Sequence, residues 1–67
     1  MKYVIYLPKQ NEFVSGFNRQ HLIVQKTALE PKARHFRTMQ QALDYIERYA
    51  DAGYALSRED CRIDLTD

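Results

Sequence analysis

The side chains best suited to catalysis or metal binding are scattered along this sequence. His21, His35 and Cys61 fall in three different predicted elements, so no nucleophile and base are spaced to cooperate. The sequence contains no Cys-x-x-Cys or His-x-x-x-His pair to begin a zinc site, and its two glycines are too few for a phosphate-binding loop. Cys61 alternates with Ile63 and Leu65 and is expected to be a small buried apolar residue. The sequence therefore predicts a protein that is not an enzyme, with no metal and no cofactor.

A short basic segment is one candidate for binding. Four basic side chains surround one aromatic ring in this segment: Lys32, Arg34, His35, Phe36 and Arg37. Basic groups interleaved with an aromatic ring can hold phosphates and stack a base. The competing interpretation is that Phe36 turns into the core just before a helix and leaves the arginines in solvent. Nucleic-acid binding through residues 32–37 is the alternative function.

A run of acidic side chains on the predicted helix is the other candidate. The residues that share this surface are Asp44, Tyr45, Glu47, Arg48 and Asp51. Carboxylates at spacings of three and four form one ridge, and an exposed Tyr45 beside Arg48 would be an anchor of the kind that interfaces favour. A merely solvated helix face gives the same pattern. We expect this ridge to bind a protein, including a basic surface that itself holds DNA or RNA.

The two candidates belong to halves of opposite charge. Residues 1–37 carry seven Lys or Arg against two Glu, a balance of +5, whereas residues 38–67 carry three Arg against seven Asp or Glu, a balance of −4. Such asymmetry can steer a charged partner although the whole chain has a net charge of only +1. The expected partner is a macromolecule, and a protein is favoured over a nucleic acid.

Length and composition indicate one small folded domain over residues 1–67. The chain has 67 residues, of which 45% are hydrophobic, and a chain of this length builds one thin core. The apolar run from Tyr3 to Leu7 is too short for a signal peptide or a membrane span. A single cysteine forms no internal disulfide, so nothing indicates an oxidising compartment. We expect a cytoplasmic domain that makes no membrane contact.

Both candidate binding surfaces depend on a sheet that holds the basic segment and the helix in place. Apolar and β-branched runs predict three strands, over 3–7, 12–17 and 21–27. Gly16 is expected to mark a bulge or a close backbone approach. Residues 61–66 alternate between apolar and polar side chains, which predicts a last strand at a sheet edge.

One helix follows a loop that Pro31 keeps from being helical throughout. Thr38 and Gln41 form a capping box, in which each side chain is expected to bond the other residue's backbone N–H. Gly53 stands where a left-handed cap is expected, so the helix is predicted over 39–52. Its apolar stripe is Met39, Ala42, Leu43, Ile46, Tyr49 and Ala50. The element order β-β-β-α-β predicts an α+β fold, in which a three-stranded antiparallel meander and a C-terminal strand carry one packed helix.

The first and third predicted strands are apolar on both faces, yet one helix covers only one face of a sheet. In the first strand, for example, Val4 and Tyr6 point to one face of the sheet, and Ile5 and Leu7 point to the other. Either the loop over 28–36 folds over the second face, or a partner or a second copy covers it and forms a homodimer.

Two local patterns accompany this layout. The meander contains the step Ser15-Gly16-Phe17, and the pattern Ala33-x-x-Phe36-x-Thr38-x-x-x-Ala42 leads into the helix. Over residues 1–54 the chain resembles small α+β proteins encoded by phages and other mobile elements, anti-CRISPR inhibitors in particular. The resemblance implies a non-enzymatic protein that binds a host nuclease complex and blocks DNA loading or cleavage, and it assigns no role to a single residue.

Overall fold

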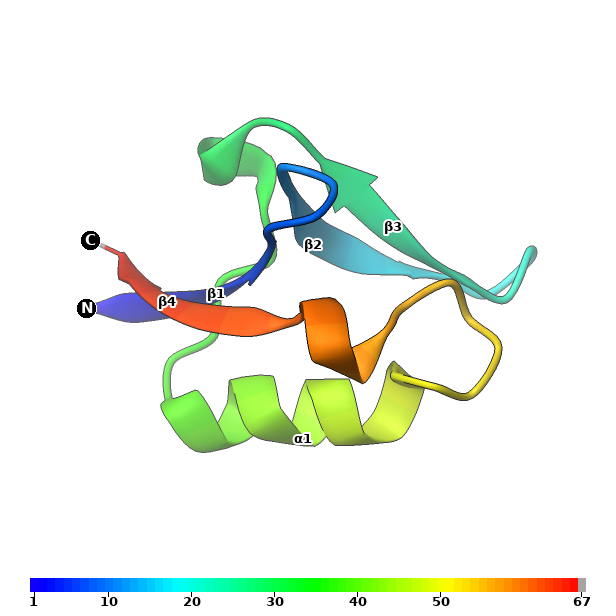
Figure 1. Cartoon of the computed structure of the whole chain (residues 1–67). Helices are drawn as coiled ribbons and strands as arrows, with labels where there is room; N and C mark the ends of the chain where they lie inside the picture. The colour runs from blue at the N-terminus through cyan, green and yellow to red at the C-terminus, as the bar shows by residue number, and fades with distance from the viewer. Residues whose placement is uncertain (67) are drawn as a thin grey trace.

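The computed structural model describes residues 1–66, which form an α+β fold with four antiparallel strands and one α-helix packed on the sheet (Figure 1). The predicted order of three strands, a helix and a strand is confirmed. The elements are β1 (Lys2–Leu7), β2 (Glu12–Asn18), β3 (Ile23–Thr27), the 3-10 helix η1 (Glu30–Lys32), α1 (Met39–Tyr49), the 3-10 helix η2 (Arg58–Asp60) and β4 (Arg62–Thr66).

The N-terminal strand lies inside the sheet, because the strand order is β3-β2-β1-β4. β4 is therefore an edge strand, as its alternating pattern predicts. β1 pairs with β4 from Lys2 opposite Thr66 to Tyr6 opposite Arg62. β1 and β2 pair beside their hairpin and then diverge (Figure 1).

The segment over residues 33–36 fills the space between the diverging strands. Phe36 and Tyr3 exchange backbone hydrogen bonds of 2.8 Å in both directions, and the Arg34 N–H donates to the Val14 carbonyl at 2.9 Å. Because the segment bonds to both β1 and β2, its backbone is fixed as it would be in a strand.

Two backbone features set the faces and ends of the strands. A register shift between Val14 and Gly16 confirms the bulge expected at Gly16. In a regular strand, residues three positions apart point to opposite faces of the sheet. The extra residue of the bulge shifts this alternation in β2, so that Val14 and Phe17 both pack in the core. β3 begins later than predicted, at Ile23, because Leu22 has a left-handed φ of 52° and still belongs to the turn.

Helix α1 begins at the residue that the sequence predicts. Thr38 Oγ1 accepts the Gln41 N–H at 3.2 Å, which is one half of the predicted capping box. The other half differs, because the Gln41 side-chain oxygen accepts the N–H of Arg37 at 3.0 Å rather than that of Thr38. The first turn is nevertheless capped by two side chains.

The helix ends at Tyr49, before the predicted cap. Ala50 is already extended, and Asp51 takes the left-handed conformation directly after it, with a φ of 60°. The Asp51 N–H then donates to the Leu56 carbonyl at 2.9 Å. The predicted helix end at residue 52 is wrong because this bond between two loop residues redirects the chain first. Gly53 does take the expected left-handed conformation, with a φ of 85°, but it lies in the loop beyond the helix.

The helix buries a face rotated from the predicted one. Ala42 and Ile46 are buried, and Tyr45 packs against the core, whereas Met39 and Leu43 are 49% and 45% exposed. The prediction is therefore wrong for Met39, Leu43 and Tyr45, because the aromatic residues of the core gather on the Tyr45 side. The core consists of Ile5, Leu7, Val14, Val24, Phe36, Ala42, Ile46, Ala50 and Leu56.

The chain itself covers the second face of the sheet around Val4, which is 1% exposed. Thr66 lies on this face, and its hydroxyl donates to Glu30 of η1 at 2.6 Å. Glu30 also faces His35 Nε2 at 3.3 Å. The hydrogen bond from Thr66 lowers the pKa of Glu30 below its ordinary value. The loop over 28–36 therefore covers part of this face, whereas Ile23 of β3 remains 40% exposed; a second copy on this face stays a prediction.

Candidate binding groove

An open groove with a volume of about 590 Å³ lies between α1, the end of β2 and the segment over 33–36. It joins parts of the two surfaces that the sequence keeps apart. Six of the predicted site residues line it: Arg34, His35, Phe36, Asp44, Tyr45 and Arg48. Arg19 also lines it, so that three arginines, Arg19, Arg34 and Arg48, face the same groove. We therefore call it the arginine groove.

The three arginines come from three different elements. Arg19 follows β2, Arg34 belongs to the segment beside β1, and Arg48 lies on α1. Within residues 1–66, none of the three forms an ion pair with a carboxylate. The Arg34 guanidinium lies 5.4 Å from the ring centre of Phe36 and 5.6 Å from that of Tyr45. These cation–π contacts orient the guanidinium and leave its N–H groups available to an anion.

Packed aromatic rings form the floor of the groove. Phe17 stacks on Tyr49 with ring centres 4.5 Å apart, and Tyr49 lies 4.6 Å from Tyr45. Phe36 meets Tyr45 edge-on at 5.5 Å. The rings come from β2, α1 and the segment over 33–36, so the packing of these elements fixes the positions of the rings. Of these three contacts, only that of Phe17 with Tyr49 is stacked, and the other two are tilted or edge-on.

Tyr45 carries an unpaired polar atom in this floor. Its hydroxyl is buried and has no hydrogen-bond partner among residues 1–66. Burial, followed by the proximity of Tyr49, raises the pKa of Tyr45 to about 12, against a smaller opposing effect of Arg34. A buried hydroxyl without a partner costs roughly 1–3 kcal/mol. Tyr45 is therefore not the exposed anchor predicted beside Arg48, and its hydroxyl remains neutral at physiological pH.

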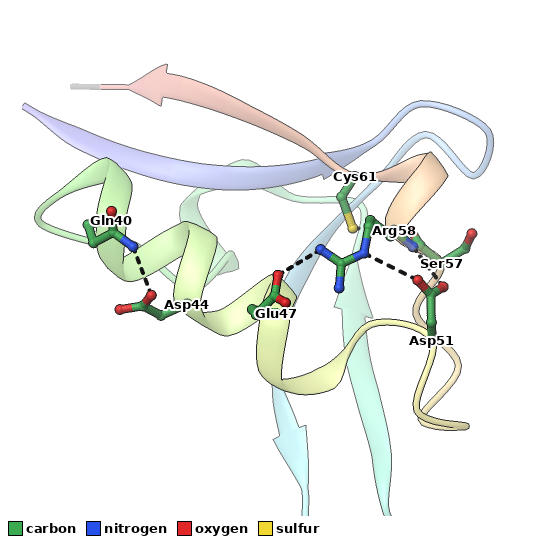
Figure 2. A network of polar contacts seen from close by, with 7 residues as sticks. All are labelled: Gln40, Asp44, Glu47, Asp51, Ser57, Arg58 and Cys61. Carbon is green, nitrogen blue, oxygen red and sulfur yellow. Dashed lines mark hydrogen bonds and ion pairs between the residues drawn. The ribbon is translucent and has the colours of Figure 1, made fainter.

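The opposite flank of α1 uses its charges inside the fold. Figure 2 shows Glu47 and Asp51 directed toward Arg58 of η2. Arg58 Nη1 lies 2.8 Å from Glu47 Oε2, and Arg58 Nε lies 3.3 Å from Asp51 Oδ2. The Arg58 N–H also donates to Asp51 Oδ1 at 3.2 Å. The hydrogen bond to Glu47 raises the pKa of Arg58 above its ordinary value. The ridge predicted as one surface is therefore divided between two flanks.

Other carboxylates of the C-terminal half are also engaged. Asp60 is 4% exposed and accepts the Lys9 N–H at 2.9 Å. Asp64 pairs with Arg62 at 2.8 Å. Asp44, at the rim of the groove, accepts a hydrogen bond from the neighbouring Gln40 at 2.9 Å (Figure 2). These carboxylates are thus engaged within the fold, while the groove arginines have no carboxylate partner within residues 1–66.

The chain matches no protein-family model, no curated protein and no solved structure. Its function is therefore inferred from the chemistry of the arginine groove. The resemblance to phage-encoded inhibitors stays a prediction.

The structure separates the residues of the predicted basic segment. Arg34 and His35 line the groove, whereas Lys32 and Arg37 are exposed outside its lining. Phe36 is 5% exposed and belongs to the core. The interpretation in which its ring stacks a base is therefore wrong, and the inward interpretation is confirmed.

Sequence reasoning missed Phe17 and Arg19 as site residues. They lie about 30 positions before Tyr45 and Arg48, and only the bulge at Gly16 places Phe17 on the helix side. The available signal was an aromatic residue and an arginine flanking Asn18. No local pattern says which part of the chain such a pair will face.

The groove offers positive charge and hydrogen-bond donors. Within residues 1–66, no three His, Cys, Asp or Glu side chains gather in a way that could hold a metal ion. In the same part of the chain, no helix has the length and apolar composition needed to cross a membrane. Cys61 packs against the core and donates to the Ser57 carbonyl at 3.2 Å, and burial raises the pKa of its thiol. The arrangement is suited to binding an anionic group.

Proposed function

We propose that this protein is a non-enzymatic protein-binding module whose arginine groove receives an acidic segment of its partner. One observation carries the proposal: Arg19, Arg34 and Arg48 line a single groove and have no carboxylate partner among residues 1–66. Arginine binds carboxylates through paired N–H donors. The groove therefore supplies the complement of an Asp- or Glu-rich surface.

The floor favours a protein over a nucleic acid. Phe17, Tyr45 and Tyr49 pack on one another, and Phe36 is buried, so these rings serve the core packing, which disfavours the stacking of a nucleic-acid base on them. Asp44 at the rim would repel a phosphate chain that runs the length of the groove. A short acidic segment can contact the groove arginines without running the length of the groove.

The identity of the partner is a narrower proposal. The resemblance of the chain to phage-encoded inhibitors makes bacterial nuclease complexes, CRISPR effectors among them, the first partners to test. In this proposal the groove holds an acidic surface segment of such a complex. The role expected for the acidic ridge passes to the groove, because Glu47 and Asp51 are engaged with Arg58.

Nucleic-acid binding is the second candidate function. The observation that favours it is that Lys32 and Arg37 are exposed on the segment that also supplies Arg34 to the groove. Together these side chains could follow a phosphate backbone. Such binding would weaken steeply with salt.

The test is titration of the folded protein with two probes of equal negative charge, a synthetic Asp/Glu-rich peptide and a single-stranded oligonucleotide. The double variant Arg34→Glu/Arg48→Glu is expected to bind the peptide about 100-fold more weakly than the wild type, since it replaces two attractive charges with repulsive ones. The matched control Arg34→Lys/Arg48→Lys keeps the charge and should retain most of the binding.

Three results distinguish the candidates. Preferential binding of the peptide supports the proposed function. Preferential binding of the oligonucleotide, lost in Arg37→Glu, moves the assignment to nucleic acid. If the double variant binds both probes as the wild type does, while circular dichroism shows that it is folded, the groove is not the site.

A further inference from the structure

The outer edge of β4 presents backbone groups that have no partner among residues 1–66. The two hydrogen bonds between Tyr3 and Phe36 use the side of β1 that faces away from β4. In an antiparallel pair the residues alternate in the direction of their N–H and C=O groups. Asp64, which lies opposite Val4, therefore points its backbone groups toward β1. Ile63 and Leu65 point theirs outward.

The other edge of the sheet is partly covered, which distinguishes it from β4. On β3, the Val24 N–H donates to the Tyr54 carbonyl at 2.8 Å. The Lys26 ammonium donates to the Ala55 carbonyl at 2.7 Å. The loop after α1 thus lies along β3 and protects it from pairing with another chain. No hydrogen bond of this kind is found outside β4 within the described residues.

An apolar strip accompanies the open edge. Leu65 lies on the helix side of the sheet, because its pairing partner Tyr3 packs in the core under α1. Met39 and Leu43 occupy the same row of α1 as Glu47, whose contact with Arg58 shows that this row faces the β4 side (Figure 2). Leu65, Met39 and Leu43 are 54%, 49% and 45% exposed. Their exposure beside an open edge calls for an occupant.

We propose that β4 pairs antiparallel with β4 of a second copy of this chain, about a two-fold axis at Ile63. The charge pattern of β4 indicates that the paired strand is another copy of β4, and it determines which residues lie opposite each other. Arg62 and Asp64 flank Ile63 and lie on the same face of the sheet, opposite Tyr6 and Val4. With the axis at Ile63, Arg62 of each copy lies directly opposite Asp64 of the other.

This register joins charges that are already paired within each chain. Arg62 Nε and Nη2 donate to the two Asp64 oxygens at 2.8 and 3.0 Å, so the dimer would link two such pairs into a four-residue network. The neighbouring register, with its axis at Asp64, would place two like charges opposite each other, which is unfavourable. In the favoured register the two Ile63 backbones bond each other, and Leu65 of each copy lies opposite Cys61 of the other on the helix side.

The dimer is independent of the arginine groove, because none of the groove arginines belongs to β4 or to the apolar strip. It also differs from a dimer through the second face of the sheet, which the loop over 28–36 partly covers. Pairing at the edge would continue the sheet through both copies and remove the open edge from each.

The test is the molar mass in solution, measured by sedimentation equilibrium from micromolar to millimolar protein. The wild type is expected to approach twice the 8.0 kDa mass of one chain as the concentration rises. Arg62→Asp and Asp64→Arg each place like charges opposite one another and should both be monomeric. An equimolar mixture of these two variants should form a heterodimer, because the opposing charges are then complementary. The double variant Arg62→Asp/Asp64→Arg should dimerise as the wild type does.

A backbone variant checks the edge without changing a charge. Leu65→Pro removes an outward N–H and leaves the bonds to β1 in place, a position at which an edge strand tolerates proline. It should be folded by circular dichroism and monomeric. A wild type that stays at 8.0 kDa throughout the range overturns the proposal. Dimerisation that persists in Leu65→Pro or in both single charge variants overturns it as well, since the contact then lies elsewhere.

Discussion

The two flanks of α1 use similar side chains for opposite purposes. On one flank, Glu47 and Asp51 are joined to Arg58. On the other, Arg48 faces the groove without a carboxylate partner in residues 1–66, and the Tyr45 hydroxyl is buried and unpaired. Glu47 and Arg48 are adjacent in sequence, but consecutive helix residues point about 100° apart. The difference teaches that a single helix can separate charges that stabilise the fold from charges left free for a ligand.

The largest expected loss of stability comes from a substitution at the buried face of α1, which holds both flanks in place. Ile46 is 6% exposed at the centre of the buried helix face. Ile46→Ala should lower the free energy of unfolding by about 2–4 kcal/mol, because it leaves a cavity under α1. Urea denaturation followed by circular dichroism measures this loss. The matched control is Leu43→Ala, which should cost less than about 1 kcal/mol since Leu43 is exposed. Equal losses for the two variants would contradict the rotated helix face.

An intermediate effect on stability is expected at Tyr45, because its buried hydroxyl has no hydrogen-bond partner within residues 1–66. Tyr45→Phe removes the buried hydroxyl that has no partner within residues 1–66, so it should raise the free energy of unfolding by about 1 kcal/mol. Because the hydroxyl is buried, the same variant should bind the acidic peptide as the wild type does. Thermal melts and peptide titration measure the two properties. Weaker peptide binding would show that the hydroxyl contacts the ligand.

The same variant should change the alkaline stability. The pKa of Tyr45 is raised from 10.0 to about 12 in the fold, so between these values the unfolded chain loses the proton while the folded chain keeps it. The wild type should therefore lose stability as the pH rises from 10 toward 12, and the contribution of Tyr45 should be fully present below pH 10. Comparison of denaturation curves at pH 9 and pH 11 should show a smaller loss for Tyr45→Phe.

The smallest effect is expected on the flank with paired charges. Arg58→Gln breaks the ion pairs with Glu47 and Asp51, but all three side chains are largely exposed, and exposed pairs contribute little. The melting temperature should fall by less than Tyr45→Phe raises it, and the difference should shrink at high salt. Peptide binding should be unchanged. Arg48→Gln should show the reverse, with weaker binding and an unchanged melting temperature; the opposite pattern would exchange the roles of the two flanks.

The sequence predicts the parts of the fold that local chemistry decides. The order of elements, the N-cap of α1 at Thr38, the bulge at Gly16 and the edge position of β4 all follow from short patterns. The end of α1 does not, because it depends on a bond from Asp51 to Leu56. The buried face of α1 was also missed, since it is set by aromatic residues that meet only in the folded chain.

The candidate site was predicted in parts but not as a whole. Arg34 and Arg48 were each identified, yet they were assigned to opposing surfaces because they lie in halves of opposite charge. Their meeting depends on the segment over 33–36 entering between β1 and β2. The sequence also could not show which carboxylates are already engaged, because Arg58 meets Glu47 and Asp51 only through the loop after α1.

The position of β1 between its neighbours has a consequence for synthesis on the ribosome. Lys2 lies opposite Thr66 and Tyr6 opposite Arg62, so β1 is synthesised well before β4, the strand that pairs with its outer side. The hairpin with β2 can form early, but the β1–β4 contact spans nearly the whole chain and adds a slow, long-range step. Until β4 has left the ribosome, the nascent chain exposes an unpaired strand, and this interval is when a chaperone or an unwanted strand from another chain has access to it.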